Sequence, residues 1–424
     1  MFSPSPLKWL YVDFNSYFAS VEQQLQPHLR GKPVAVVPVE TDSTCAIAAS
    51  YEAKAFGVKT GTPIWEARQK CPDLICVLAR HEAYVDYHHR AIDEINRHIP
   101  VTDVCSIDEM AARLMRNEAS EVAARKIALS IKAGLAANLG PWVRCSIGIA
   151  ANRYLAKVAT DIEKPDGLTI LMPDDVERRL MALKPRDLPG IGANMERRLR
   201  LAGIFSVEDI WALDRRTMRR VWGSVWGERM WYLLRGHDLP ELPTKRRSLG
   251  HSHVLGPALR PPAHAINVAR RLTLKACSRM RRMGYHATVF GFSARLEDGR
   301  RIYVENRCRP AQDSMTFLDM LLAFWDAHIP KERGILVKKL SVVLYGLVHE
   351  GAVQPDLFDF VAEDIPKPRH DVERQNRLSH ALDQINHRFG RDSALIGMLP
   401  SQGRSFSGTK IAFTRIPDRE EFLE

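Results

Sequence analysis

Two stretches of this chain alternate short apolar runs with segments of helical spacing, and a purely helical stretch separates them. The first alternation covers residues 8–168, the second covers 251–348, and residues 174–236 show helical spacing alone. Strands that alternate with helices predict a mixed sheet covered by helices, and each change of pattern marks a domain boundary. A chain of 424 residues is also too long for one hydrophobic core. We therefore expect an α+β multidomain protein.

The first alternating stretch should fold as a mixed sheet with its helices on one face. Its predicted elements are a strand over 8–13, a helix over 16–25, a hairpin over 33–50, a helix over 81–98, one strand over 102–110, a helix over 118–138 and a strand over 142–150. The second stretch predicts helices over 263–283 and 315–328 among four strands. After residue 350 the composition becomes polar and broken, which predicts a loosely packed tail.

The cysteines and the apolar runs restrict the setting of the chain. Seven cysteines are scattered without a CxxC pair, which indicates reduced, structural thiols in a cytoplasmic protein and argues against a zinc site. The N-terminus lacks a basic region followed by a long apolar core, so we expect no signal peptide. Without a run of 18 apolar residues, we expect no membrane partner.

Positive charge is concentrated in one segment. The formal net charge is +11, yet residues 245–309 alone contain 15 Lys and Arg against three acids, Glu297, Asp298 and Glu305. Bulk charge leaves a merely basic protein and a polyanion binder about equally open. The concentration favours nucleic acid, because a local basic footprint is typical of proteins that bind it.

Three carboxylates lie at predicted strand ends. Asp13 ends the first strand, and Asp108 and Glu109 end the strand VCSIDEM that could lie beside it. An oxygen-only site of this kind suits Mg²⁺, and two Mg²⁺ ions can serve both oxygens of a phosphoryl transfer. The alternative is that the acids are simply solvated strand-end residues. From the carboxylates alone the two interpretations remain open.

Several other residues could contact a nucleotide or a duplex. Tyr51 and Lys54 share a helix face, and the loop residue Lys164 could reach a triphosphate. Phe18 could lie under a nucleotide sugar and exclude a 2′-OH. Taken singly, each lysine is better explained as a solvated surface residue and Phe18 as a core aromatic of the first helix.

The turn LPGIG offers glycine amides at a helix start, where a phosphate can bind without sequence readout. Gly190 and Gly192 supply these amides, and a run with Arg197, Arg198 and Arg200 follows. The alternative is an ordinary tight turn between helices. The arginines favour contact with DNA.

Five motifs in order, namely VDFNSYFASVE, ASYEAKAFGVKTGTP, SIDE, SIGIAANRYLAKVATDIEKPDG and LPGIG, resemble the Y-family translesion DNA polymerases of bacteria, of the polymerase IV and polymerase V catalytic-subunit type. The resemblance covers roughly residues 8–350. It implies a right-hand polymerase with a ferredoxin-like palm, small fingers, a helical thumb with a helix-hairpin-helix, and an α/β little finger. The implied bounds are palm 1–19 and 81–168, fingers 20–80, thumb 169–236, linker 237–250, little finger 251–350 and tail 351–424.

The resemblance also implies roles for individual residues. Asp13, Asp108, Glu109 and the backbone carbonyl of Phe14 resemble the ligands of two Mg²⁺ ions. Phe18 matches the steric gate, preceded by Tyr17, and together with Tyr51, Lys54 and Lys164 these residues would contact the dNTP. Gly190 and Gly192 would grip primer-template DNA. A basic helix is expected to hold the DNA backbone through Arg270, Arg271, Lys275, Arg279, Arg281 and Arg282.

Three positions depart from the family pattern. Asn15 replaces a common Asp, and Lys54 replaces a common Arg, which removes a bidentate fork. The stretch MAARLM follows SIDE where an alternating strand with another acid is usual, so this strand could be short or differently packed.

The tail suggests partners. QPDLFDF resembles the bacterial sliding-clamp-binding peptide, with Gln354, Leu357 and Phe358 filling clamp pockets. ALDQINHRFGRDSALIG resembles the extension of polymerase V catalytic subunits, which adds other mutagenesis subunits to the expected partners. We expect a monomeric DNA-directed DNA polymerase that performs low-fidelity translesion synthesis. The alternatives are an inactive DNA- and clamp-binding scaffold and a two-metal nuclease.

Overall fold

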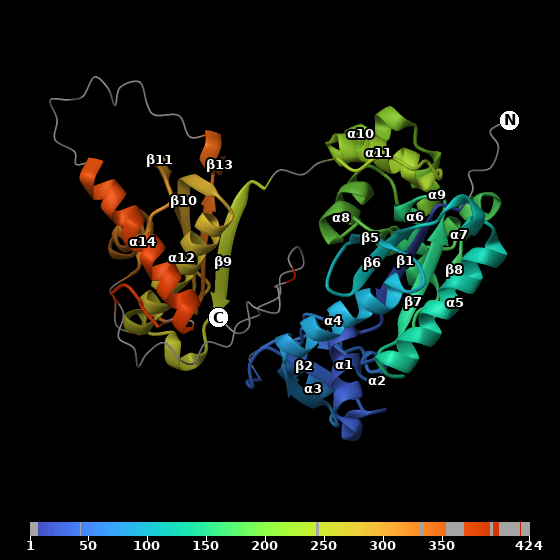
Figure 1. The fold of residues 1–424 in the computed structure, drawn as a ribbon, viewed down its shortest axis with the longest axis horizontal. Coiled ribbons are helices and arrows are strands. Elements are labelled where there is room, and N and C mark those ends of the chain that lie inside the picture. The colour runs from blue at the N-terminus through green and yellow to red at the C-terminus, as the bar shows by residue number, and fades with distance from the viewer. Residues whose placement is uncertain are drawn as a thin grey trace. The chain divides into compact units, whose positions relative to one another are not determined.

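The computed structural model describes residues 7–42, 44–242, 246–330, 332, 334–352, 369–390, 393–397 and 416. Figure 1 shows a chain that separates into two compact units. The first comprises Met1–Glu241 with a short C-terminal segment, and the second begins at Leu242. No helix among the described residues has both the length and the apolar character that a bilayer crossing requires.

A five-stranded sheet with the order β5-β6-β1-β7-β8 forms the centre of the first unit. The central strand β1 (Trp9–Phe14) is antiparallel to β6 (Glu109–Arg113) and to β7 (Cys145–Ala150). The edges are β5 (Val101–Val104), antiparallel to β6, and β8 (Leu168–Ile170), parallel to β7. Every residue of β1 is buried, as expected for a strand covered on both faces.

Helices cover both faces of this sheet, so the prediction of a single helical face is wrong. Leu10 and Val12 pack with the helices α1 (Tyr17–Leu25), α4 (His81–Asn96) and α5 (Glu121–Asn138). Tyr11 belongs to a separate core that includes α6 (Arg153–Ile162). Successive strand residues point to opposite faces, and here both faces are apolar over the length of β1. A strand without alternation cannot reveal how many helical layers cover it.

The predicted single strand over 102–110 is also wrong. β5 ends at Val104 and β6 begins at Glu109, so the intervening residues form a hairpin turn. The turn closes with a hydrogen bond from the Cys105 amide to the Glu109 carbonyl at 2.9 Å. The stretch MAARLM is therefore largely an ordinary strand, since Met110, Ala111 and Ala112 are buried in β6. Its departure from the family pattern leaves the sheet intact.

A smaller three-stranded sheet carries its own core. β2 (Val34–Val37) pairs antiparallel with β3 (Ala48–Ala49), which confirms the predicted hairpin, and parallel with β4 (Ile75–Leu78). The helices α2 (Tyr51–Ala55) and α3 (Ile64–Lys70) pack on it. The Ser50 hydroxyl accepts a hydrogen bond from the Ala53 amide at 3.3 Å and so caps α2.

Five short helices follow the five-stranded sheet of the first unit and share a core with α6. They are α7 (Val176–Met181), α8 (Ala193–Leu201), α9 (Val207–Ala212), α10 (Arg215–Trp222) and α11 (Val225–Leu234). Polar contacts reinforce the junction, because the Tyr154 hydroxyl donates to the Pro189 carbonyl at 3.2 Å and Asn152 Nδ2 donates to the Leu233 carbonyl at 2.7 Å. The helical stretch is thus built onto the α6 face of the sheet.

The second unit contains the sheet β11-β10-β12-β9. Its strands are β9 (Ser248–Val254), β10 (Tyr285–Leu296), β11 (Arg301–Ala311) and β12 (Val337–Tyr345), all neighbours being antiparallel, and β13 (Val348–His349) pairs with β10. The helices α12 (Pro262–Arg282) and α13 (Ser314–His328) pack with one face of the sheet. β9 starts inside the predicted linker, which is therefore shorter than expected.

The tail contains a long helix, so the expectation of a loosely packed tail is wrong for this part. α14 (Arg369–Phe389), which Figure 1 shows in the second unit, contacts α13. Asp383 on α14 forms an ion pair with Arg281 on α12 at 2.7 Å. The clamp-like residues Gln354, Leu357 and Phe358 lie outside the described residues.

Candidate active site

The register of the palm sheet places two of the predicted carboxylates on one face. Asp13 is paired with Glu109 on one side and with Ser146 on the other. These side chains alternate with the apolar ones of the other face, so they lie on the face that α6 covers. Asp13 is nevertheless 5% exposed, and a carboxylate this deeply buried requires a partner.

Asp108 lies in the hairpin turn between β5 and β6, not at a strand end. The Ser106 hydroxyl donates to Asp108 Oδ1 at 2.6 Å, and the Phe14 amide donates to the Asp108 carbonyl at 2.9 Å. Burial raises the pKa of Asp108, and the carboxylates of Asp13 and Glu109 raise it further. Two adjacent acids within a strand would point to opposite faces of the sheet. Because Asp108 lies in the turn, its side chain does not follow this alternation.

A histidine outside the predicted set fixes this turn. His88 on α4 is 2% exposed, and its Nδ1 lies 2.7 Å from the Ile107 carbonyl oxygen. A carbonyl oxygen can only accept, so Nδ1 carries the proton. Burial lowers the pKa of His88 to about 4, which keeps the ring neutral near pH 7. No sequence signal separates this histidine from the neighbouring His89.

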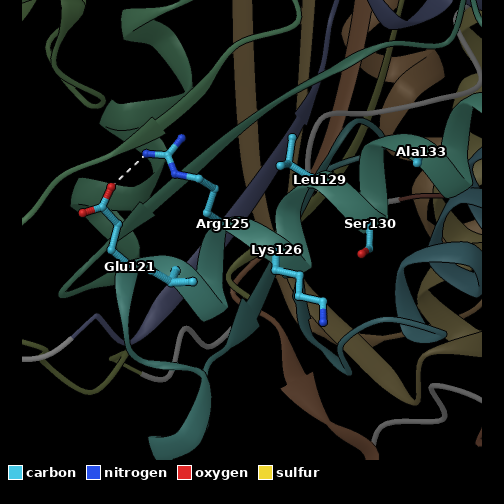
Figure 2. A pocket seen from close by; sticks show the side chains of 7 residues that line it. Glu121, Arg125, Lys126, Leu129, Ser130 and Ala133 are labelled. Carbon is cyan, nitrogen blue, oxygen red and sulfur yellow. Dashed lines mark hydrogen bonds and ion pairs between the residues drawn. The ribbon is translucent and has the colours of Figure 1, made fainter.

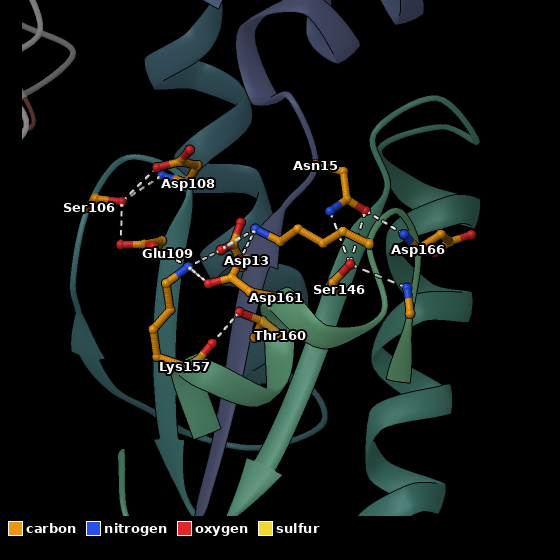
Figure 3. A network of polar contacts seen from close by, with 12 residues as sticks. Asp13, Asn15, Ser106, Asp108, Glu109, Ser146, Lys157, Thr160, Asp161 and Asp166 are labelled. Carbon is orange, nitrogen blue, oxygen red and sulfur yellow. Dashed lines mark hydrogen bonds and ion pairs between the residues drawn. The ribbon is translucent and has the colours of Figure 1, made fainter. Parts of the chain in front are cut away.

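Two lysines supply the positive charge around Asp13, as Figure 3 shows. Lys157 on α6 pairs with Asp13, with Glu109 Oε1 at 2.9 Å and with Asp161 Oδ2 at 3.5 Å. Lys164 Nζ lies 2.7 Å from both Asp13 Oδ2 and Asp161 Oδ1. Burial lowers the pKa of Lys157, but the three carboxylates outweigh burial and the net shift is upward. No sequence motif distinguishes Lys157 from the other lysines of the chain.

The donor set fits a hard divalent cation. Asp13, Asp108 and Glu109 offer only carboxylate oxygens, the ligand type that Mg²⁺ prefers. Among the described residues no three His, Cys, Asp or Glu side chains already surround a common point. Two ammonium groups instead neutralise Asp13, which demonstrates that this end of the sheet attracts cations.

The aromatic ring of Phe18 is held from behind. It stacks on Tyr84 with ring centroids 4.3 Å apart and an interplanar angle of 13°. The Tyr84 hydroxyl donates to Glu22 Oε1 at 2.8 Å, and Glu22 pairs with Arg80. Phe18 therefore has a rigid support. A side chain that excludes a larger substituent by its shape requires such a support.

Tyr17 does not fit its predicted contact with the nucleotide, and this prediction is corrected. Its side chain belongs to the buried core, and its hydroxyl donates to the Tyr84 carbonyl at 2.7 Å. The residue supports the same aromatic group from inside. Adjacent residues in the first turn of a helix point in different directions. Tyr17 can therefore face inward while Phe18 faces outward.

The predicted triphosphate residues lie together. Lys54 Nζ is 4.4 Å from the centre of the Tyr51 ring. Burial and then the charge of Lys164 lower the pKa of Lys54, and burial raises the pKa of Tyr51. Lys164 comes from another segment of the chain, so the fold joins the two halves of this basic group.

Asn15, the first departure from the family pattern, has a structural role here. Its Oδ1 accepts from the Asp166 amide at 2.7 Å, and its Nδ2 donates to Ser146 Oγ at 3.0 Å (Figure 3). Ser146 Oγ also accepts from the Gly167 amide at 3.2 Å. Asn15 thus ties the loop that carries Lys164 to the end of β1.

The LPGIG turn has the geometry expected of a hairpin between helices. Gly190 has φ +90°, which a side chain would disfavour, and Gly192 precedes α8 with open space where a Cβ would lie. Arg198 donates to the Trp222 carbonyl at 2.7 Å and Arg200 pairs with Glu196 at 3.1 Å. Arg197 is exposed on the same helix.

The basic helix α12 differs from the prediction. The Arg281 side chain is 3% exposed and pairs with Asp383, so it cannot hold a DNA backbone. Arg270 donates to the Gly397 carbonyl at 2.8 Å, and Arg271, Lys275 and Arg279 are only partly exposed. One side of α12 covers the sheet, and Arg282 near its end is exposed.

The open face of the second sheet carries exposed basic residues that the sequence analysis did not single out. The register aligns Arg295 with Arg301 and with Lys339, and Arg307 lies farther along β11. All four are exposed, whereas the apolar residues of β10 and β12 face α12 and α13. Strand alternation predicts that these side chains share one face of the sheet. The spacing alone does not reveal whether that face is the one exposed to solvent.

A hollow on α5 lies apart from the carboxylates. Figure 2 shows its lining, which comes from one helix and includes Val122, Lys126, Leu129 and the Glu121–Arg125 pair. The inner side of α5 packs on the sheet face opposite to that of Asp13. The hollow therefore does not contribute to the site.

Family models match three successive regions of the chain. The impB/mucB/samB family model matches residues 12–161, the thumb-domain model of DNA polymerase-iota matches 186–238, and the impB/mucB/samB C-terminal domain model matches 246–357. The matched regions include all three carboxylates, the LPGIG turn and the second sheet.

Curated relatives are similar over most of the chain. DNA polymerase IV of Pelotomaculum thermopropionicum is 32% identical over 396 residues, which cover 91% of this chain and 94% of the relative. DNA polymerase IV 1 of Bacillus subtilis is 31% identical over 388 residues, 90% of each chain.

Solved structures share the fold. A Y-family DNA polymerase chimera of Dbh and Dpo4 has a TM-score of 0.67 at 24% identity, covering 81% of this chain and 99% of the other. An insertion ternary complex of Dbh DNA polymerase has a TM-score of 0.53 at 25% identity, with the same coverage.

Proposed function

Because this chain belongs to the Y family of DNA polymerases, we propose that it performs template-directed translesion synthesis of low fidelity. It is a DNA-directed DNA polymerase, in agreement with its family and its relatives. One observation carries the proposal: Asp13, Asp108 and Glu109 lie at one end of the sheet, beside the basic group of Lys54 and Lys164.

Asp13, Asp108, Glu109 and the carbonyl of Phe14 would hold two Mg²⁺ ions, given the oxygen-only donor set. When bound, Mg²⁺ would lower the pKa of the primer 3′-OH and neutralise charge on the leaving pyrophosphate. In the proposed reaction the 3′ oxygen attacks the α-phosphate of the dNTP, and the bond to pyrophosphate breaks. Ser106 orients Asp108 for this role through its 2.6 Å hydrogen bond.

The nucleotide would lie between two groups of this chain. Lys54, Tyr51 and Lys164 form a basic group that suits a triphosphate, with lysine acting as a point charge. Phe18, stacked on Tyr84, would occupy the space of a ribose 2′-OH and so select deoxyribose. Only a small sheet and two short helices form the fingers, which supports an open site with little checking of base-pair shape.

Duplex DNA would be held by backbone contacts. Glycine amides of the LPGIG turn and the exposed Arg197 suit phosphate binding without sequence readout. In the second unit we assign DNA binding to the open sheet face with Arg295, Arg301, Arg307 and Lys339, in place of the predicted helix. Binding through such contacts should weaken steeply with added salt.

The QPDLFDF segment supports a sliding-clamp partner by resemblance alone. Replacing Leu357 and Phe358 by Ala should abolish retention of the protein on immobilised bacterial clamp. Undiminished retention would reject the motif.

Primer extension with Mg²⁺ and dNTPs tests the function. Wild type should extend a primer, Asp108→Ala should not, and Asp93→Ala, which removes an exposed carboxylate of α4, should behave as wild type. Absence of extension by pure wild type, with and without clamp, would contradict polymerase activity.

A further inference from the structure

Helix α14 presents several polar side chains to its domain. Ser379 is 1% exposed, and its hydroxyl accepts a hydrogen bond from the Ser314 amide at 3.0 Å. Asp383 pairs with Arg281 at 2.7 Å, and Arg281 also donates to the Gln312 carbonyl at 2.7 Å. These polar contacts help to fix α14 to its unit.

The polar inner side continues to the end of the helix. Asn386 Nδ2 donates to the Ala394 carbonyl at 3.0 Å, and its Oδ1 accepts from the Ala394 amide at 2.9 Å. Ser379, Asp383 and Asn386 are four and three residues apart, which places them on one side of the helix.

An apolar row runs beside this polar side, about 100° around the helix. Leu378, Ile385 and Phe389 are 47%, 39% and 67% exposed. They are seven and four residues apart, the spacing of a single narrow seam along a helix. We call these three residues the α14 seam. Surface helices normally bury such a seam, and a contiguous apolar strip left in solvent marks an interaction surface.

Positive charge borders the seam on one side. Arg374, Arg377 and Arg388 are exposed, and at 100° per residue all three lie to the same side of the seam. Arg388 also stacks over the Phe389 ring at 5.3 Å. Two copies of α14 paired along the seam would bring arginines together, which like-charge repulsion opposes.

From this arrangement we infer that the α14 seam is a docking surface for an acidic amphipathic helix of a partner protein. The partner's apolar residues would cover the seam, and its carboxylates would meet the three arginines. The narrow seam suits a helix laid alongside more than a bilayer, which favours a wider apolar face on a helix whose polar side is solvated. The surface is separate from the residues assigned to catalysis and to DNA.

Binding of a synthetic helix to the full chain tests this inference. The probe is a fluorescein-labelled peptide of about 20 residues with leucines in an a/d pattern and glutamates beside them. Fluorescence anisotropy should detect saturable binding by wild type. Leu378→Ser with Ile385→Ser should weaken it by at least about tenfold, which corresponds to about 1.4 kcal/mol. Arg374→Ser with Arg377→Ser should weaken it severalfold and reduce its dependence on salt.

Two further variants, one off the seam and one on it, separate the effect of the seam from general effects of substitution on α14. Val372→Ser removes an apolar residue of α14 that is 56% exposed but lies off the seam, and it should bind the probe as wild type does. Phe389→Ser changes the last residue of α14, where loss of folding is not expected, and should weaken binding as well. All variants should keep the circular dichroism spectrum and the primer extension of wild type.

Several outcomes would overturn the inference. Equal binding by wild type and the Leu378/Ile385 variant would exclude the seam, and equal binding of a lysine-flanked probe would exclude the charge match. Self-association that the variant abolishes, seen by sedimentation without probe, would assign the seam to a second copy. Binding of vesicles of phosphatidylglycerol and phosphatidylcholine, lost in the variant while the probe never binds, would assign it to a membrane.

Discussion

Lys157→Met removes the ammonium group that contacts Asp13, Glu109 and Asp161 while keeping a side chain of similar length. The side chains of Lys157 and Asp13 are 19% and 7% exposed, so the carboxylates lose a largely buried counter-ion. Removing one partner of a buried ion pair costs about 3–5 kcal/mol of folding free energy. Because both side chains keep some exposure, we expect a cost of about 3 kcal/mol here. We expect the free energy of unfolding of the first unit to fall by that amount in EDTA.

The same variant should respond more strongly to Mg²⁺. In wild type a metal ion must displace Lys157 from Asp13 and Glu109, whereas in the variant the carboxylates have lost this cation. A ligand at about 100 times its Kd stabilises the folded state by about 2.7 kcal/mol. Mg²⁺ should therefore recover most of the loss in the variant and add less to wild type.

Differential scanning calorimetry in EDTA and across a Mg²⁺ titration measures both effects. For a unit of this size a loss of 3 kcal/mol lowers the transition temperature by about 6–12 °C. Lys126→Met, an exposed lysine of α5, is the matched control and should change little. A variant that melts within about 2 °C of wild type in EDTA, or gains no more from Mg²⁺, would refute the counter-ion argument.

Three further predictions follow from individual contacts. Because burial raises the pKa of Asp108, the native state binds its proton more tightly, so stability in EDTA should fall as pH rises from the ordinary carboxyl pKa through the raised value. Asp108→Asn should lack this decline in calorimetry, and parallel pH profiles of the two proteins would contradict it. Phe18→Ala should increase ribonucleotide incorporation in single-nucleotide primer extension, and an unchanged sugar preference would reject the gate. Asp383→Asn leaves Arg281 buried without an anion, so urea unfolding of the second unit should show a loss of about 3 kcal/mol. Arg281→Met with Asp383→Leu should restore most of it, and a neutral single variant would indicate that the pair does not form.

The sequence was informative where local pattern determines local structure. The strand that ends near Asp13, the LPGIG hairpin and the basic group around Lys54 were all predicted from short motifs. The Asp108 hairpin was not, because VCSIDEM contains no Gly or Pro and its turn-forming Ser106 and Asp108 were assigned to one continuous strand. Strand pairing, which is a tertiary property, makes Asp108 a turn residue and Glu109 the start of β6.

Residues whose role depends on distant partners were beyond sequence reasoning. His88, Lys157 and Arg281 look like ordinary helix residues until the fold brings Ile107, Asp13 and Asp383 to them. α14 escaped prediction because several of its apolar residues are exposed and its contacts with the domain include buried polar residues such as Ser379, so it lacks the usual helical pattern. The same limitation misassigned Arg281 of α12, which is buried against Asp383.

The continuous core between the palm sheet and the thumb helices has a consequence for movement along DNA. Tyr11 lies two residues from Asp13 on the same face of β1, and it shares one core with Ile191 of the LPGIG turn. Tyr154 also ties that turn to α6 through the Pro189 carbonyl. A swing of the thumb would open this core to water, so the thumb keeps a fixed distance to the site of chemistry. With the DNA contact that we propose for this hairpin, translocation after each added nucleotide would come from the duplex sliding past it.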